Sequence, residues 1–366
     1  MNIPGGIQNR RLTLWQCNSN DPDQVFTITN VNTTPPPSYN YVFPWQNGDE
    51  GFLQDDYYRR VAIDDSQLSN GGNVVTRNAN NFDHDQKMKI LTNSYGYIFQ
   101  RSGTNYGISS TSNNNVEMLT HVYQSGFNSY QSFRATSIGN NRYMFRRYND
   151  PERCLSTASG SITVNVQIKT CNQNDPAQRF QFKKIIQDEY QAWLIGRKYN
   201  GSQNFSTTNL GHAFLGVARI QTITNGSGSE TSWTDLNTYS RWPNSNGPNV
   251  NHTTDYSQAQ EFINTGKIGN LDIGLRMAKI SKSKSDWIKQ NHTITGCLNY
   301  SVLDFRPFDN CVCTEQAARL WDEITGENFS NQINGINIAP NNFVNLINQY
   351  NSAQGGILAN NGQVIN

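Results

Sequence analysis

The sequence predicts two domains, an all-β domain followed by an α+β domain. The chain has 366 residues, which is longer than most domains that are built around a single hydrophobic core. One sequence pattern occurs twice without a gap, in residues 17–26 (CNSNDPDQVF) and in residues 171–180 (CNQNDPAQRF). Residues 313–325, in contrast, carry apolar side chains at the spacing of a helix. The repeat ends before residue 187, so the first domain covers residues 1–186 and the second covers residues 187–366.

The composition limits the partners of the chain. The formal net charge is +1 and only 16% of the residues are charged, so the basic footprint of a nucleic-acid-binding protein is missing and we expect no nucleic-acid partner. The apolar runs are far shorter than the roughly 20 residues of a membrane-spanning helix, so we expect no transmembrane segment. A polar surface of Asn, Gln, Ser and Thr with 11% aromatic residues favours an extracellular, carbohydrate-facing protein.

The N-terminus and the cysteines bear on compartment and cofactors. The first residues, MNIPGGIQNRR, contain no apolar core segment, so no signal peptide is visible. We expect a secreted or extracellular protein whose signal was removed or whose export uses another route. Cys311 and Cys313 are two residues apart, but no second close pair of Cys or His completes a metal site. We therefore expect neither a metal nor another cofactor.

A Gln-x-aromatic ending recurs through the first half. It stands at Gln24, Gln131 and Gln178, and a weaker copy with Met in place of the aromatic residue stands at Gln86; the four Gln residues are 62, 45 and 47 residues apart. A short stretch of alternating apolar and polar residues precedes each ending, as in RRLTLWQC and NVQIKTC. Short strands at regular spacing with polar turns predict an all-β barrel or sandwich.

The segment CLSTAS…VQIKTC precedes the last of these endings. Together with this segment, the regular recurrence of the endings resembles the ricin B-type β-trefoil lectin domains. The resemblance covers about residues 1–186 and implies a β-trefoil whose partner is a glycan or glycoconjugate surface. In that family a disulfide joins a Cys-Leu start to a later Cys within a repeat. Cys154 and Cys171 match these two positions and are therefore expected to form a disulfide.

The chain departs from the family in several places. Residues 1–28 correspond to the second half of an extra repeat, and residues 34–56 form a Pro-rich insertion. The sugar-binding members carry Asn before the Gln and Asp after Cys-Leu, and no repeat here keeps both. The residues found instead are Asp23, Asp85, Tyr130 and Ala177 before the Gln, and Ser156 after Cys154-Leu155. Sugar binding and a scaffold role both stay open, and we assign no sugar-binding residue.

The second half predicts a strand, a partner strand and then helices. Residues 210–220 form an alternating apolar strand that carries His212, and residues 231–239 complete a hairpin across a Gly-Ser turn. We expect helices at about residues 255–264 and 281–290. Pro340 fits the first turn of a last helix.

The helix over residues 313–325 places a thiol at its start. Ala317, Leu320, Trp321 and Ile324 form one apolar face, and the same face continued backward reaches Cys313. The positive end of the helix dipole favours the thiolate, which is the nucleophilic form. A cysteine on an apolar face is also commonly a small buried hydrophobic residue, so both roles are considered.

Four segments of the second half resemble, in their order, the circularly permuted papain-like hydrolases, which include the NlpC-related and lecithin retinol acyltransferase-like groups. The segments are GHAFLGV, YSRWPN, RPFDNCVCTEQAARLW and APNNFVNLI. The resemblance spans residues 193–352 at the level of motifs. It implies that Cys313 is the nucleophile and that His212, on a strand, is its base. Peptide, peptidoglycan peptide and lipid acyl groups are the implied substrates.

Two positions of this site have alternatives. Asn310-Cys311 matches a second form of the family motif, so Cys311 is the alternative nucleophile; a Cys311–Cys297 disulfide is the structural alternative. Asp235 on the partner strand is our choice for the group that orients His212. Asn237 and Glu230 are its competitors.

The two halves together predict a secreted or delivered, toxin-like effector that joins a lectin to a hydrolase. Its trefoil would select a glycan or cell surface, and its thiol site would cleave an amide or an ester. The rival function is a non-enzymatic lectin-like toxin or adhesin subunit in which the second domain is structural.

Overall fold

The structure is a computed structural model, and Tyr41–Asn366 forms one compact unit. It describes residues 39–42, 44–64, 68–110, 116–120, 129–158, 162–198, 212–242, 248–269, 272–293, 313–330, 340–354, 359–360 and 363–364. The extra half-repeat predicted over residues 1–28, part of the 34–56 insertion, Cys297 and Cys311 lie outside these residues.

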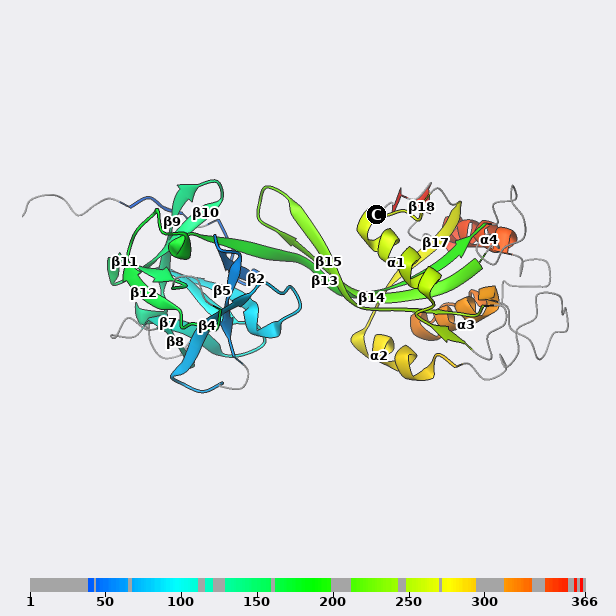
Figure 1. The fold of residues 1–366 in the computed structure, drawn as a ribbon, viewed down its shortest axis with the longest axis horizontal. Coiled ribbons are helices and arrows are strands. Elements are labelled where there is room, and N and C mark those ends of the chain that lie inside the picture. The colour runs from blue at the N-terminus through cyan, green and yellow to red at the C-terminus, as the bar shows by residue number, and fades with distance from the viewer. Residues whose placement is uncertain are drawn as a thin grey trace, which may run out of the picture. The chain divides into compact units, whose positions relative to one another are not determined.

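The strands of the first half, within the described ranges, form three repeats of four strands (Figure 1). They are β2 (Glu50–Asp55), β3 (Arg59–Ile63), β4 (Gly72–Asn78), β5 (Lys87–Asn93), β6 (Gly96–Arg101), β7 (Tyr106–Ser110), β8 (Val116–Thr120), β9 (Phe133–Gly139), β10 (Arg142–Arg147), β11 (Asp150–Ser156), β12 (Gln167–Thr170) and β13 (Phe180–Arg197), while β1 (Tyr41–Val42) adds to β9. In each repeat the first strand pairs with the second and the fourth, and the second pairs with the third. Pairings β5–β6, β9–β10 and β13–β2 then close a barrel, which is the β-trefoil that the repeats predicted.

The Gln of the recurrent motif organises the turn that ends a repeat. The side chain of Gln178 donates to the carbonyl of Thr170 at 3.0 Å and accepts from the backbone N–H of Asn172 at 2.9 Å. Gln86 makes the same two contacts, with Asn78 at 2.8 Å and Asn80 at 3.1 Å. These buried amides satisfy backbone groups that the turn leaves unpaired, so the motif serves the fold.

The trefoil is held by an apolar core and one disulfide. Phenylalanine side chains, including Phe99, Phe145 and Phe180, meet in its centre and are fully buried. The predicted disulfide between Cys154 and Cys171 is confirmed, and it joins β11 to the residue that directly follows β12, 17 residues along the chain. A closed loop of this length restricts the unfolded chain and stabilises the fold by about 3 kcal/mol.

The second half is a sheet that begins inside the trefoil. The strand β13 belongs to both, so the boundary predicted after residue 186 falls within a strand. The other elements are β14 (His212–Thr224), β15 (Ser229–Ser240), β16 (Asn249–Val250), β17 (Ile273–Ile280), α1 (Thr253–Thr265), α2 (Lys282–Asn291), α3 (Cys313–Thr325), α4 (Pro340–Gln354), β18 (Ala359–Asn360) and β19 (Gln363–Val364). The sheet runs β16–β15–β14–β13–β17, all antiparallel, and the predicted strands and helices of this half are confirmed.

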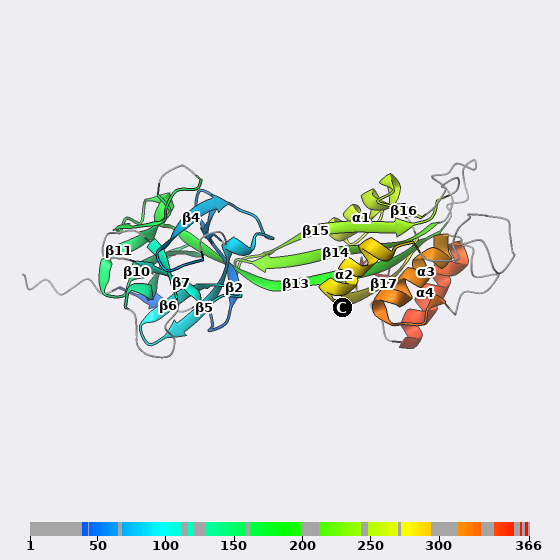
Figure 2. The same ribbon diagram turned by 90° about the horizontal axis from the view of Figure 1, so that it is seen from below.

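The two faces of this sheet bury different helices (Figure 2). Ala192 and Leu194 of β13 point to the face covered by α2, α3 and α4. Trp193 and Ile195 point to the opposite face, which α1 covers. The alternation follows from the period of two in a strand, and it brings α1 and α3 to opposite sides of β14.

Candidate active site

His212 is the first residue of β14 and is buried, with 3% of its surface exposed. Its Nε2 lies 3.2 Å from Oδ1 and 3.3 Å from Oδ2 of Asp255, and Cys313 is near enough to raise the pKa of the imidazole. The indole ring of Trp242 packs against the imidazole at 4.2 Å between ring centres. Three elements, β14, α1 and α3, therefore meet at this histidine.

Asp255 is held in place by several donors. It lies in the first turn of α1, where the helix dipole favours a carboxylate, and its side chain is fully buried. Its Oδ2 accepts from the indole Nε1 of Trp242 at 2.8 Å and from the hydroxyl of Ser240. Burial would raise the pKa of Asp255, but the charge of His212 and these hydrogen bonds keep that pKa below its usual value.

Cys313 opens α3 and is a free thiol with 4% of its surface exposed. Its position at the first residue of the helix agrees with the apolar face predicted from the sequence. Burial by itself would lower the pKa of His212. The negative charges of Cys313 and Asp255, with hydrogen bonds to both, outweigh burial and raise that pKa to about 9. This environment favours the protonated imidazole of His212.

Arg197 adds a second buried cation beside these groups. It is the cross-strand partner of His212, and 4% of its surface is exposed. Its guanidinium lies 5.6 Å from the centre of the Trp242 ring, and neither Nε nor Nη2 has an acceptor among the described residues. Burial lowers the pKa of Arg197, whereas Asp255 and Cys313 oppose that shift. Unpaired N–H groups here could bind a negatively charged group.

The structure does not bring Asp235 to His212. Asp235 lies in a bulge of β15 opposite Ala218, six residues along β14 from His212, which is roughly 20 Å of strand. Its half-exposed carboxylate lies 4.0 Å from Nζ of Lys289. Asn237 and Glu230 pair with Val217 and Ile223, also away from His212. The carboxylate at His212 is Asp255, which we did not predict.

The sequence contained only an indirect sign of Asp255. The predicted helix over residues 255–264 began at this residue, but acidic residues in a first turn usually serve the helix dipole. Its contact with His212 depends on the register of the sheet. The alternative nucleophile Cys311 and its possible partner Cys297 lie outside the described residues, so Cys313 alone is placed here.

Three of the positions at which the chain departs from the sugar-binding pattern, Asp85, Ala177 and Ser156, are buried in the described trefoil. Asp85 accepts from Arg77 at 2.8 Å and from Arg101 at 3.0 Å. Ala177 and Ser156 are buried side chains of the third repeat. The second repeat has Tyr130, whose ring lies 5.5 Å from the guanidinium of Arg147. Asp23 lies outside the described residues.

No grouping of three or more His, Cys, Asp or Glu side chains within the described part of the chain is arranged to hold a metal ion. No helix in that same part is both long and apolar enough to cross a lipid bilayer.

No protein-family profile matches the chain, and no curated protein matches it. Several solved structures match a part of it. The designed threefold-symmetric protein ThreeFoil is 14% identical, with a TM-score of 0.32 over 36% of this chain and 96% of its own. The C-half of an earthworm R-type lectin, solved with GalNAc, is 12% identical, with a TM-score of 0.30 over 37% of this chain and 98% of its own.

A mosquitocidal holotoxin is 17% identical, with a TM-score of 0.35 over 56% of this chain. The match spans only 30% of the toxin's own length. Each likeness concerns part of a chain, and the trefoil assignment rests on the strand pairings described above.

Proposed function

We propose that the chain joins a β-trefoil targeting module to a cysteine hydrolase module. Cys313 is the nucleophile, His212 is its acid–base partner, and Asp255 orients the imidazole in place of Asp235. The observation that carries the proposal is the buried contact of His212 with Asp255, at the start of β14, the strand on which the helix that opens with Cys313 packs. A catalytic triad consists of a nucleophile, a base and a carboxylate that orients the base, and these three residues supply those groups.

The chemistry follows from these positions. The thiolate of Cys313 attacks the carbonyl carbon of an amide or ester and forms a thioester after the tetrahedral intermediate collapses. The imidazolium of His212 gives its proton to the leaving nitrogen or oxygen, and the neutral imidazole then takes a proton from the water that hydrolyses the thioester. Backbone N–H groups in the first turn of α3 and the guanidinium of Arg197 would stabilise the oxyanion.

The substrate classes are a peptide, a peptidoglycan peptide or a lipid acyl group, as the resemblance to permuted papain-like hydrolases implies. The trefoil would direct this activity to a glycan or cell surface, as in a toxin or effector. The Cys154–Cys171 disulfide supports a secreted or delivered protein, because such bonds persist in oxidising compartments.

The test is cleavage of fluorogenic peptide amides, peptidoglycan peptides and acyl esters by the full chain. We expect turnover of at least one class, complete loss in Cys313→Ala, and alkylation of Cys313 by iodoacetamide in mass-spectrometric peptide maps. The full-length protein with Asp235→Asn is the matched control and should keep its activity. A wild-type protein that cleaves none of them and whose Cys313 resists alkylation would overturn the proposal.

One observation favours the rival function. Cys313 packs in the apolar cluster of α3 with Leu320 and Trp321, which is where a structural cysteine also lies. In that case the chain is a non-enzymatic lectin-like toxin or adhesin subunit, and Cys313→Ala changes stability without changing binding or toxicity.

A further inference from the structure

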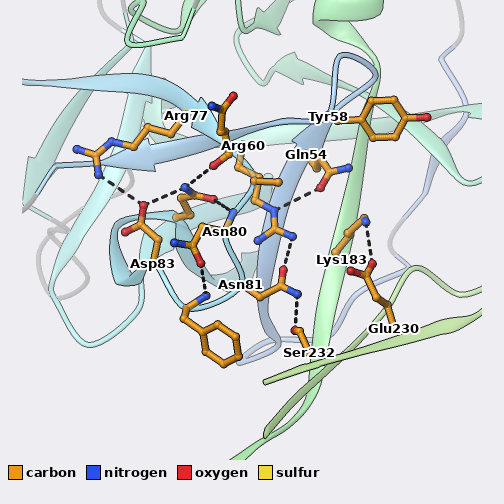
Figure 3. A pocket seen from close by; sticks show the side chains of 14 residues that line it. Gln54, Tyr58, Arg60, Arg77, Asn80, Asn81, Asp83, Lys183, Glu230 and Ser232 are labelled. Atoms are coloured by element: carbon orange, nitrogen blue, oxygen red, sulfur yellow. Dashed lines mark hydrogen bonds and ion pairs between the residues drawn. The ribbon is translucent and has the colours of Figure 1, made fainter. Parts of the chain in front are cut away.

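A polar pocket lies where the first repeat of the trefoil faces β13 and β15. Its volume is about 880 Å³, and its walls come from β2, β3, the loop after β4 and the strand β15. Figure 3 shows the guanidinium of Arg60 between the side chains of Gln54 and Asn81, with Lys183 and Glu230 at the side formed by β13 and β15. Nothing in the proposed hydrolase site uses these residues.

Arg60 is a buried cation without a carboxylate partner in the described part of the chain. Only 2% of its surface is exposed, and its guanidinium lies 3.9 Å from the centre of the Phe52 ring. Nε donates to Gln54 at 3.3 Å and Nη2 donates to Asn81 at 2.6 Å, while Nη1 has no acceptor. Burial lowers the pKa of Arg60 to about 10, and Glu230 and Asp83 oppose that shift. An unpaired buried guanidinium N–H group is costly unless an acceptor occupies the site.

The arginine next to Arg60 differs from it in having carboxylate partners. Arg60 of β3 pairs directly with Arg77 of β4, and like charges opposite each other in a sheet repel. Arg77 is neutralised by Asp64, Asp83 and Asp85. Arg60 forms no ion pair among the described residues, so its guanidinium is available to an anionic ligand.

The rest of the pocket has the chemistry of a sugar site. The amide of Asn81 donates to the hydroxyl of Ser232 at 2.6 Å, and both line the pocket with Gln54. Amides and hydroxyls can donate to and accept from sugar hydroxyls. Tyr58 lines the same pocket with 73% of its surface exposed and with a φ of 60°, a left-handed conformation that is strained for a bulky residue. Its ring offers an apolar face to a sugar ring.

We propose that this pocket binds a carboxylate-bearing sugar residue of a glycan, with Arg60 receiving the carboxylate and Tyr58 lying against the sugar ring. The carboxylate supplies the acceptor that Nη1 lacks, and Asn81, Ser232 and Gln54 contact the hydroxyls. The inference rests on the targeting part of the proposed function and places its glycan site outside the positions used in the resembled family. It is independent of the chemistry at Cys313.

The test is isothermal titration of the full chain with sialyllactose, with a glucuronic-acid disaccharide, with sulfated lactose and with neutral lactose. We expect a carboxylated sugar to bind at least about tenfold more tightly than lactose or sulfated lactose, as a charged hydrogen bond implies. Arg60→Gln should weaken that binding by about tenfold to hundredfold. Equal binding of all four sugars would overturn the inference, as would an unchanged affinity in folded Arg60→Gln.

Two more variants keep the test decisive if Arg60→Gln does not fold. Tyr58→Ala removes an exposed ring, and Asn81→Ala removes the contacts to Arg60 and Ser232. Both should weaken carboxylated-sugar binding severalfold, whereas Gln173→Ala, at the equivalent turn position of the third repeat, should not. The inference would be contradicted if both Tyr58→Ala and Asn81→Ala bound the carboxylated sugar as tightly as the wild type.

The outcomes separate this inference from the proposed function. Binding of neutral glycans alone overturns the acidic site and leaves glycan targeting intact, whereas no glycan binding overturns both. Alkylation of Cys313 should be the same in wild type and Arg60→Gln, so the hydrolase proposal stands or falls on its own.

Discussion

Nε2 of His212 lies 3.2 Å from Oδ1 of Asp255, although 43 residues separate the two in the chain. The contact joins the first residue of β14 to the first turn of α1. It supplies the negative charge that, with Cys313, keeps the imidazole protonated when it is buried. The predictions below follow from this contact and from the packing around it.

Replacing Asp255 by Asn should slow the alkylation of Cys313 by iodoacetamide. The amide keeps the shape of the side chain but removes a charge that raises the pKa of His212, so less of the imidazolium that activates the thiol remains at neutral pH. A loss of one pKa unit corresponds to about a tenfold change. Mass-spectrometric peptide mapping of Cys313 over time gives the rate. Asp235→Asn should react like wild type, and equal rates in all three proteins would contradict the role of Asp255.

The stability of the chain should fall in alkaline solution because of His212. Its pKa is about 9 in the folded protein and about 6.5 in an unfolded chain. A raised folded-state pKa contributes stability that is fully present below pH 6.5 and is lost as the pH rises through 9. Urea unfolding at pH 6.5 and pH 9.5 measures the difference. His212→Gln should show a clearly smaller loss over this interval, and the same loss in both proteins would argue against a protonated His212.

Gly274→Ala should weaken the docking of α4 on β17. A methyl group at this position would lie 3.0 Å from both the Cα and the carbonyl oxygen of Val344, and backbone atoms cannot move aside easily. We expect the free energy of unfolding to fall by about 1 to 3 kcal/mol, as for an overpacked core. Chemical denaturation followed by tryptophan fluorescence measures it. Gly228→Ala is the control, because nothing lies within 4 Å of that position, and it should change stability by less than about 0.5 kcal/mol.

Gln178→Ala should destabilise the trefoil. The variant leaves the carbonyl of Thr170 and the N–H of Asn172 without their buried partner. The expected cost is about 1 to 3 kcal/mol, seen as a lower midpoint in thermal unfolding. Gln173→Ala changes an exposed amide in the same turn and should leave the midpoint unchanged. A midpoint shift of the same size in both variants would mean that the turn, and not the Gln178 contacts, is responsible.

Much of the fold follows from local patterns. The Gln-x-aromatic endings and the alternating stretches predicted the trefoil, because each repeat carries its own strands and turn. The helix over residues 313–325 was predicted from an apolar face that the buried residues Ala317, Leu320 and Trp321 now display. The domain boundary was less accessible, because β13 continues from one sheet into the next without a turn residue to mark the change.

The sequence by itself determined the trefoil repeats, the Cys154–Cys171 pair, the thiol at the start of α3 and the histidine at the start of a strand. The repeats, the helix and the strand depend on patterns within short segments, and the cysteine pair was implied by the resemblance to the ricin B-type family. Only the tertiary structure decided that Asp255, and not Asp235, meets His212, and that Arg60 forms no ion pair with a carboxylate among the residues that the structure describes. Both results depend on the register of the strands and on how a helix lies across the sheet. Local periodicity does not set such contacts, because the two partners are far apart in the chain, 43 residues in the case of His212 and Asp255.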